Sequence, residues 1–272
     1  MNDRGTPLNR ARGSLKARIR AQERLVGCFV FMQAPAIVEI LALAGFDFVV
    51  IDLEHAPKDW ETVENLIRAA DVHGLPALVR VPEIAPQGIL HALECGAAGI
   101  VLPFVQHAEE VQRAAREMFY APLGERGTCT QTRAAGFGAR RADFMRHAAL
   151  QNEELVLIGL VESPQGVQNA AALLAVEPGL DAISVGRSDL ASAMGRPGQA
   201  GDAQVMAATR TVLKAARAHP DGPKASAMVI YGAAEVGGWA DEGCSIFIAP
   251  SESTLLHEAA QRWSTDVLKG VL

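Results

Sequence analysis

Short apolar runs and longer helical segments alternate along the chain after residue 24. The apolar runs are rich in β-branched residues and predict strands, whereas the Ala-, Leu-, Glu- and Arg-rich stretches between them predict helices. Several of the expected helices end in glycine, a common residue at a helix stop. The expected strands span residues 25–32, 46–54, 76–83, 99–105, 155–163, 181–188, 224–230 and 244–250.

The expected strands are apolar at consecutive positions, which indicates that both of their faces are buried. Such strands are typical of parallel sheets covered by helices. About eight strand-then-helix units in succession predict an α/β fold, the (β/α)₈ or TIM barrel. A doubly wound open sheet is the alternative, but no G-x-G-x-x-G follows the first strand.

The two ends of the chain carry different signals. Residues 1–24 are basic without an apolar core, and they predict a basic tail that leads into a polar N-terminal surface helix; a weak organelle presequence is the alternative. We expect residues 1–272 to form a single barrel domain. Residues 253–272 are amphipathic, with Leu256 and Trp263 on one face. They predict either an ordinary eighth barrel helix or a C-terminal helix exchanged between subunits as a domain swap.

Composition narrows the class of protein. The chain has 272 residues, of which 49% are hydrophobic and 21% charged, enough to bury a large core. Its net charge of −6 argues against a nucleic-acid partner. No apolar run approaches the roughly 18 residues of a membrane span. The cysteines are dispersed without a C-x-x-C pair, which predicts free thiols in a reducing compartment and so a cytoplasmic protein.

Polar residues collect where the expected strands end. In a TIM barrel these carboxyl ends carry the active site. Each residue also has a purely structural interpretation: Asp52 as a helix cap, His55 as a loop histidine, and the acids as partners of nearby arginines. The residues at these ends are Asp52, Glu54, His55, Arg80, Glu162 and Asp189.

Glu162 and Asp189 follow neighbouring strands, so they are expected to face one pocket. Two carboxylates in one pocket repel each other unless a proton or a metal ion lies between them. A site of oxygen ligands with open positions suits a hard divalent ion, Mg²⁺ or Mn²⁺. No His or Cys lies beside the two acids, which disfavours zinc.

A series of motifs resembles one family. "GFDFVVIDLEHAP", "LVRVPE", "ECGAAGIVLPFV", "YAPLGERG", "VES" and "GRSDLASAMG" occur in the order and spacing of the pyruvate-dependent class II aldolases of the HpcH/HpaI family. The resemblance covers nearly all of the chain after residue 24. Relatives include 4-hydroxy-2-oxoheptanedioate aldolase and 2-dehydro-3-deoxyglucarate aldolase.

The resemblance implies a reaction and an assembly. The reaction is metal-dependent retro-aldol cleavage, or aldol addition, of 4-hydroxy-2-keto acids, which interconverts them with pyruvate and an aldehyde through a metal-bound pyruvate enolate. The cofactor is Mg²⁺ or Mn²⁺, with Co²⁺ as a further candidate. Family members are commonly hexamers built as trimers of dimers.

The resemblance also implies roles for acids and a base. Glu162 and Asp189 match the two metal-binding carboxylates. His55 matches the catalytic base, which acts through a water molecule. Glu94 stands where relatives have an acid that hydrogen-bonds this histidine, in the same subunit or from a neighbour. Asp52 matches an acid near the metal-bound water.

The substrate side of the site is implied in the same way. Arg80 matches the arginine that holds the keto oxygen of pyruvate. The backbone groups of Gly186 and Ser188 match those that hold the pyruvate carboxylate. Arg187 stands where relatives usually have Pro or a small residue. It either binds a second carboxylate of the substrate or pairs with a surface acid.

Other departures bear on the substrate more than on the reaction. Leu160 replaces a Gln beside the metal site, and Leu53 replaces a Gly found in several relatives. The long loop around 124–141 is a candidate to close over the aldehyde.

A second branch of the family performs related chemistry on oxaloacetate, as a citrate synthase or a decarboxylase, and this alternative stays open. An alternative from another functional class is a non-catalytic barrel that binds a keto acid. Such a protein is expected to lack metal-binding or catalytic residues, whereas Glu162, Asp189, Arg80 and His55 are all present.

Overall fold

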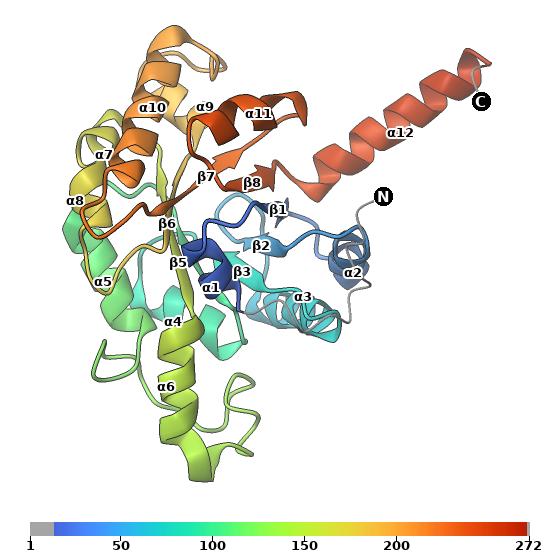
Figure 1. The fold of residues 1–272 in the computed structure, drawn as a ribbon. Helices are drawn as coiled ribbons and strands as arrows, with labels where there is room; N and C mark the ends of the chain where they lie inside the picture. Colours follow the sequence, from blue (N-terminus) through green and yellow to red (C-terminus); the bar gives the residue numbers. More distant parts are fainter. Residues whose placement is uncertain (1–13, 271–272) are drawn as a thin grey trace.

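Eight parallel strands close into a barrel in the computed structural model, which describes residues 14–270. Each strand pairs with the next one along the chain, and the last pairs with the first (Figure 1). The barrel fold and all eight expected strands are therefore confirmed, whereas residues 1–13 of the basic segment predicted over residues 1–24 lie outside the described residues. The strands are β1 (Leu25–Val30), β2 (Phe48–Asp52), β3 (Ala77–Arg80), β4 (Gly99–Leu102), β5 (Val156–Val161), β6 (Ala182–Val185), β7 (Ala225–Val229) and β8 (Ile246–Ala249).

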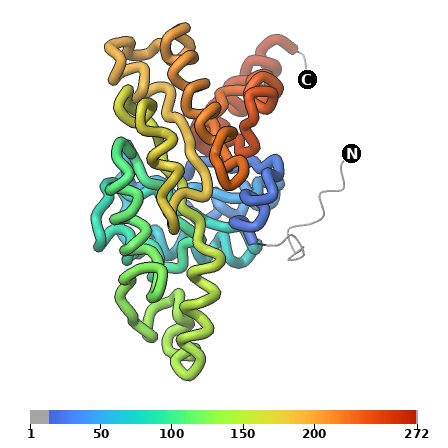
Figure 2. Tube along the Cα trace, turned by 60° about the vertical axis from the view of Figure 1, so that its left-hand side comes forward, coloured from blue at the N-terminus to red at the C-terminus, as the bar shows by residue number. Residues whose placement is uncertain are grey.

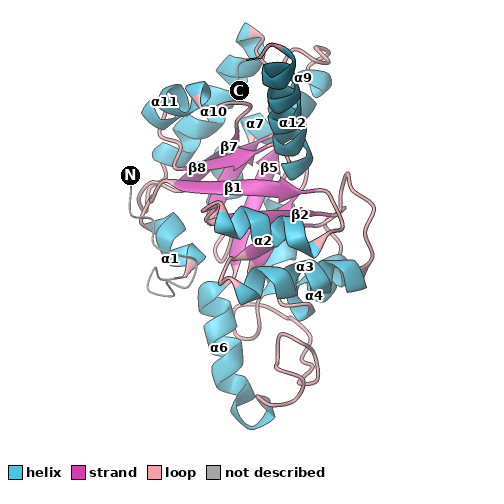
Figure 3. Cartoon of the chain, turned by 90° about the vertical axis from the view of Figure 1, so that its right-hand side faces the viewer, coloured by secondary structure: helices cyan, strands magenta, loops and turns pink. Residues whose placement is uncertain are grey.

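Helices surround the strands on the outside of the barrel (Figure 3). No helix of the described chain is both long and apolar enough to cross a membrane. The helices are α1 (Leu15–Arg20), α2 (Pro35–Leu43), α3 (Trp60–Val72), α4 (Pro86–Glu94), α5 (Ala108–Met118), η2 (Arg141–Asp143), α6 (Phe144–Glu154), α7 (Pro164–Gln168), α8 (Ala170–Leu174), α9 (Arg187–Ala193), α10 (Ala203–Arg217), α11 (Ala234–Asp241) and α12 (Glu252–Leu268).

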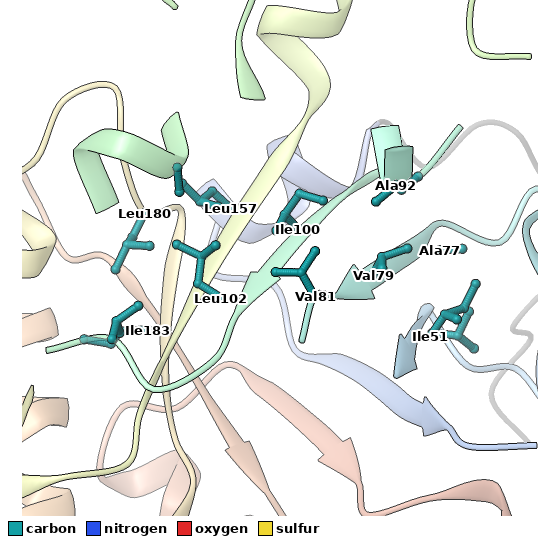
Figure 4. Packing of buried hydrophobic residues seen from close by; sticks show 14 of the residues in the cluster. Ile51, Ala77, Val79, Val81, Ala92, Ile100, Leu102, Leu157, Leu180 and Ile183 are labelled. Atoms are coloured by element: carbon teal, nitrogen blue, oxygen red, sulfur yellow. The ribbon is translucent and has the colours of Figure 1, made fainter. Parts of the chain in front are cut away.

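Every strand divides its side chains between two apolar layers. Along β2, Phe48 and Val50 belong to a cluster inside the barrel, whereas Val49 and Ile51 belong to the cluster between strands and helices. The outer cluster is shown in Figure 4, where side chains of β2–β6 meet the helices. Because successive side chains of a strand point to opposite faces, the parity of a position decides which layer it joins.

The N-terminal helix is a plug rather than the polar surface helix that the sequence predicts. Leu15 and Ile19 of α1 are 5% and 1% exposed, and both join the cluster inside the barrel. The buried ammonium of Lys16 donates to the carbonyl of Leu155 at 2.8 Å and lies 3.1 Å from the Asp181 carboxylate. The barrel mouth at the amino ends of the strands needs an apolar cover, and α1 supplies it.

The long loop between α5 and α6, residues 121–141, lies at the same end of the barrel. The Ala134 N–H donates to the carbonyl of Glu94 at 3.1 Å, and Arg133 donates to the carbonyl of Cys95 at 2.9 Å, shortly before β4 begins. The expectation that this loop closes over the acceptor of its own chain is therefore wrong. The helix α6 was not predicted, because only two of its 11 residues are buried and no apolar stripe marks it.

The last helix projects away from the barrel (Figure 1), and its C-terminal end lies at the edge of the molecule in Figure 2 as well. Within α12 only Glu252 is buried, and its carboxylate accepts hydrogen bonds from the backbone N–H groups of Phe31 and Met32. Leu256 and Trp263 on the apolar face are 54% and 65% exposed. Within one chain this segment is therefore not an ordinary eighth helix packed against the barrel, which was one of the two interpretations of the sequence.

The plug leads to a prediction about stability. Replacing Ile19 by Ala should lower the free energy of unfolding by about 2–4 kcal/mol, because the side chain is fully buried under the barrel. Ile40, which is 57% exposed on α2, provides the matched control, and its change to Ala should alter stability by less than about 0.5 kcal/mol. Urea denaturation of both variants is the measurement, and equal effects would contradict the plug.

Candidate active site

The polar residues at the carboxyl ends of the strands reach the pocket by strand alternation. Glu162 follows Ile158 and Leu160, which both point into the barrel, so it points inward as well. Asp52 continues the inward series of β2, and Arg80 that of β3. The three charged residues are at most 6% exposed, so together they form a buried polar layer above the apolar interior.

Asp52 and Arg80 form the best-defined contact of this layer. They are register partners on β2 and β3, and the Arg80 Nε donates to Asp52 Oδ2 at 2.6 Å while Nη2 binds the same oxygen. The guanidinium also lies over the Phe29 ring, 4.7 Å from its centroid. The other oxygen of Asp52 accepts the His55 N–H at 2.7 Å. One carboxylate thus orients both the arginine and the loop that carries the histidine.

Glu54 belongs to the site although the sequence analysis assigned it no role. Its Oε2 lies 2.9 Å from Arg80 Nη1 and 3.8 Å from His55 Nε2. Burial raises the pKa of Glu54, and the neighbouring cations offset this only in part. The alternation of side chains along the strand could have predicted this position, because Glu54 is two residues beyond Asp52 and so faces the same side.

Glu162 is a buried carboxylate with a strongly shifted pKa. Burial is the main cause, and the negative charges of Glu54 and Asp189 add to it, raising the pKa to about 7 despite a hydrogen bond from the Phe104 N–H at 2.8 Å. A Cβ at Gly186 would lie 2.5 Å from Glu162 Oε1. The glycine is therefore required for the carboxylate to occupy this place.

The residues present suit a hard divalent ion. Asp189 lies in the first turn of α9 and is exposed, and its charge acts on Glu162. The described residues include no group of three or more His, Cys, Asp or Glu placed to hold a metal. A pair of carboxylates leaves most coordination positions to water and substrate, which matches the way Mg²⁺ is usually bound. Burial and the two neighbouring carboxylates together raise the pKa of Glu162, so a cation bound here would be favoured electrostatically.

Two predicted site residues lie elsewhere in the single chain. Glu94 ends α4, near the amino ends of the strands, and no contact joins it to His55 among the described residues. The Arg187 guanidinium donates to Glu235 Oε2 at 2.7 Å, which agrees with the alternative that it pairs with a surface acid. Ser188 lies in the first turn of α9, beside Asp189.

The two departures near the site have simple places in the structure. Leu160 is 3% exposed and packs inside the barrel beneath Glu162. This apolar residue extends the interior cluster as far as the layer of charged residues at the carboxyl ends of the strands. Leu53 packs partly buried against the outer cluster, so it does not line the pocket.

A closed (β/α)₈ barrel with buried acids and an arginine at the carboxyl ends of its strands defines a class of enzyme rather than a single one. Comparison of the sequence resolves the class further. Residues 25–258 match the HpcH/HpaI aldolase/citrate lyase family, and the chain belongs to this family. It is accordingly an enzyme, a carbon–carbon lyase.

Known proteins of this kind cover most of the chain. A 5-keto-4-deoxy-D-glucarate aldolase of Escherichia coli is 37% identical over 204 residues, which are 75% of this chain and 78% of the relative. A crystal structure of an HpcH/HpaI family protein from Burkholderia cenocepacia has a TM-score of 0.86 and 30% identity, covering 93% and 98% of the two chains. The citrate synthase SbnG has a TM-score of 0.83 and 28% identity, covering 95% and 99%.

The pKa of Glu162 leads to a prediction about metal binding. Below its pKa of about 7 the carboxyl holds a proton that a metal ion bound at Glu162 would have to displace, so in that case Mn²⁺ affinity should rise about tenfold per pH unit up to pH 7 and level off above it. Titration calorimetry from about pH 5.5 to 8 is the measurement. Glu54→Gln removes a nearby negative charge and should shift the break to lower pH. An affinity that is flat over this range would contradict the assignment.

Proposed function

We propose that this protein catalyses metal-dependent retro-aldol cleavage, and the reverse addition, of 4-hydroxy-2-keto acids to give pyruvate and an aldehyde. The observation that carries the proposal is the buried Asp52–Arg80 pair beside Glu162. A fixed cation next to a carboxylate pair suits a substrate that acquires negative charge on oxygen. The family and the 5-keto-4-deoxy-D-glucarate aldolase relative support the same reaction type.

Arg80 provides electrostatic stabilisation in this mechanism. When the bond between C3 and C4 of the substrate breaks, its electrons pass to the pyruvate fragment and leave an enolate oxygen. A guanidinium held by Asp52 and Phe29 needs no rearrangement to stabilise this oxygen. Arginine also keeps its proton in such a site. Glu162 and Asp189 would hold the metal ion, which supplies Lewis-acid polarisation of the keto acid when bound.

His55 is the proposed base. Its side chain is 53% exposed at the pocket, where an incoming substrate can reach it. It takes the proton of the C4 hydroxyl, through a water molecule, as the aldehyde forms. The Glu54 carboxylate lies 3.8 Å from the Nε2 of His55, so the contact with the substrate is left to Nδ1 and water. Within one chain Glu94 lies at the opposite end of the barrel from His55. We therefore propose that the acid that hydrogen-bonds His55 is the Glu94 of a neighbouring subunit.

The substrate of the relative points to a sugar acid as the starting candidate. The E. coli protein is an aldolase of 5-keto-4-deoxy-D-glucarate, and Arg80, His55, Glu162 and Asp189 serve that chemistry equally well. Enolate chemistry on oxaloacetate is the second candidate. The likeness to the citrate synthase SbnG over almost the whole chain favours it.

Assembly and location are part of the proposal. The exposed apolar face of α12 needs a cover, and we propose that a second copy supplies it by exchanging this helix within a hexamer of three dimers. The cysteines Cys28, Cys95, Cys129 and Cys244 are all free thiols, which suits work in the cytoplasm.

The reaction is tested with a panel of 4-hydroxy-2-keto acids, with and without Mg²⁺ or Mn²⁺, by coupling pyruvate release to lactate dehydrogenase. Glu162→Ala and Asp189→Ala should abolish release through loss of the metal, whereas His55→Ala should lose cleavage and keep pyruvate binding. Glu177→Ala, which removes a carboxylate of an exposed ion pair at the other end of the barrel, should stay active.

Two outcomes would change the proposal. Full activity of Glu162→Ala after chelator treatment would exclude the metal mechanism. If the wild type released no pyruvate from any substrate of the panel, the aldolase proposal would fail. Oxaloacetate, with and without acetyl-CoA, would then be the next substrate to test.

The exchange of α12 predicts an effect on assembly. Trp263→Asp places a charge on the apolar face and should shift the protein to smaller species in light scattering coupled to gel filtration. Gln261→Asp adds the same charge on the opposite side of the helix and should leave the mass unchanged. Equal masses for both variants and the wild type would contradict the exchange.

A further inference from the structure

Arg187 joins α9 to the segment that follows β7. Its side chain is buried, and its Nη2 donates to the carbonyl of Val229 at 2.9 Å and to Glu235 Oε2 at 2.7 Å. The guanidinium lies 5.2 Å from the Trp239 ring centroid and 5.7 Å from that of Tyr231. Arg187 thus connects the start of α9 with the segment that follows β7.

Glu235 fixes the same segment from the other side. Its Oε1 accepts the Tyr231 N–H at 2.9 Å, and its Oε2 accepts the Trp239 Nε1–H at 3.3 Å in addition to Arg187. Burial alone would raise the pKa of this carboxyl, but these donors outweigh it and hold the pKa below its usual value. The backbone and the ring of Tyr231 are therefore both anchored.

The anchoring places one hydroxyl group beside another at the pocket. The Tyr231 hydroxyl lies 3.1 Å from Ser188 Oγ, and Ser188 directly precedes Asp189. Tyr231 is 55% exposed, whereas Arg187 and Trp239 behind it are 8% and 4% exposed. Two hydroxyls that bond to each other use only one O–H, so the pair keeps a donor for a ligand.

We propose that Tyr231, paired with Ser188, binds the carboxylate of the 2-keto acid, and that Arg187 and Glu235 are its positioning residues. The inference rests on the proposed function, in which the backbone of Gly186 and Ser188 holds this carboxylate. A carboxylate at that place accepts a hydrogen bond from the adjacent hydroxyl pair, and a bond to a charged acceptor is the stronger kind. Arg187 then serves the substrate through Tyr231 without touching it.

The test uses deuterium exchange into the pyruvate methyl group with Mn²⁺ and no aldehyde, so only keto-acid binding and enolisation contribute. Tyr231→Phe should raise the KM for pyruvate about tenfold, the usual effect of losing one hydrogen bond to a charged group, with kcat changed less than about twofold. Tyr120→Phe is the matched control, because Tyr120 is buried at the opposite end of the barrel.

The positioning role has its own readout. Arg187→Met should also raise the KM for pyruvate while leaving kcat of the exchange near the wild-type value. Adding Arg187→Met to Tyr231→Phe should cause little further increase, because both changes remove the same contact. Fully additive effects would assign Arg187 a merely structural role and overturn this part.

Two further outcomes separate this inference from the proposed function. An unchanged pyruvate KM in Tyr231→Phe, or a change confined to the KM of the aldehyde in the condensation reaction, would overturn the carboxylate contact. If the wild type shows no exchange at all, the proposed reaction fails. Calorimetry of oxalate binding with Mn²⁺ still decides the contact in that case, since equal affinities of wild type and Tyr231→Phe would exclude it.

Discussion

Closure of the barrel is the constraint on which the rest of this structure depends. Once β8 pairs with β1, every strand has one face inside the ring and one face against the helices, and parity assigns each side chain to a side. The interior is too narrow for anything but packed side chains. The inward positions at the top of β2, β3 and β5 are therefore forced into one small space, and in this chain they are Asp52, Arg80 and Glu162.

Charged groups in such a space are costly unless each has a partner. The ion pair between Asp52 and Arg80 is almost fully buried, and an uncompensated member of such a pair typically costs about 3–5 kcal/mol. Glu162 accepts a hydrogen bond from the Phe104 N–H, but burial outweighs this bond and the charge of Arg80 and raises the pKa of the carboxyl to about 7. The metal ion of the proposed mechanism would supply a countercharge to this carboxylate. Function here is maintained against a cost in stability.

The edge of the pocket next to β6 and β7 is organised differently. There the cation is Arg187, which contacts Glu235, a backbone carbonyl and two aromatic rings. In the proposed arrangement Arg187 does not touch the substrate. We infer that this network serves to position the ring of Tyr231 beside the site.

The apolar runs of the sequence determined the eight strands and their order, because strands buried on both faces have few other arrangements. The strand-end acids and Arg80 followed from the same pattern, and the motifs led to the family. Tertiary structure alone decided the rest. Glu94 and the loop at 124–141 fall at the far end of the barrel, because a helix that follows a strand must run back to the opposite end. The burial of α1, the contact of Glu54 with Arg80, and the turn of Arg187 toward Glu235 depend on residues distant in sequence, whose proximity no local pattern encodes.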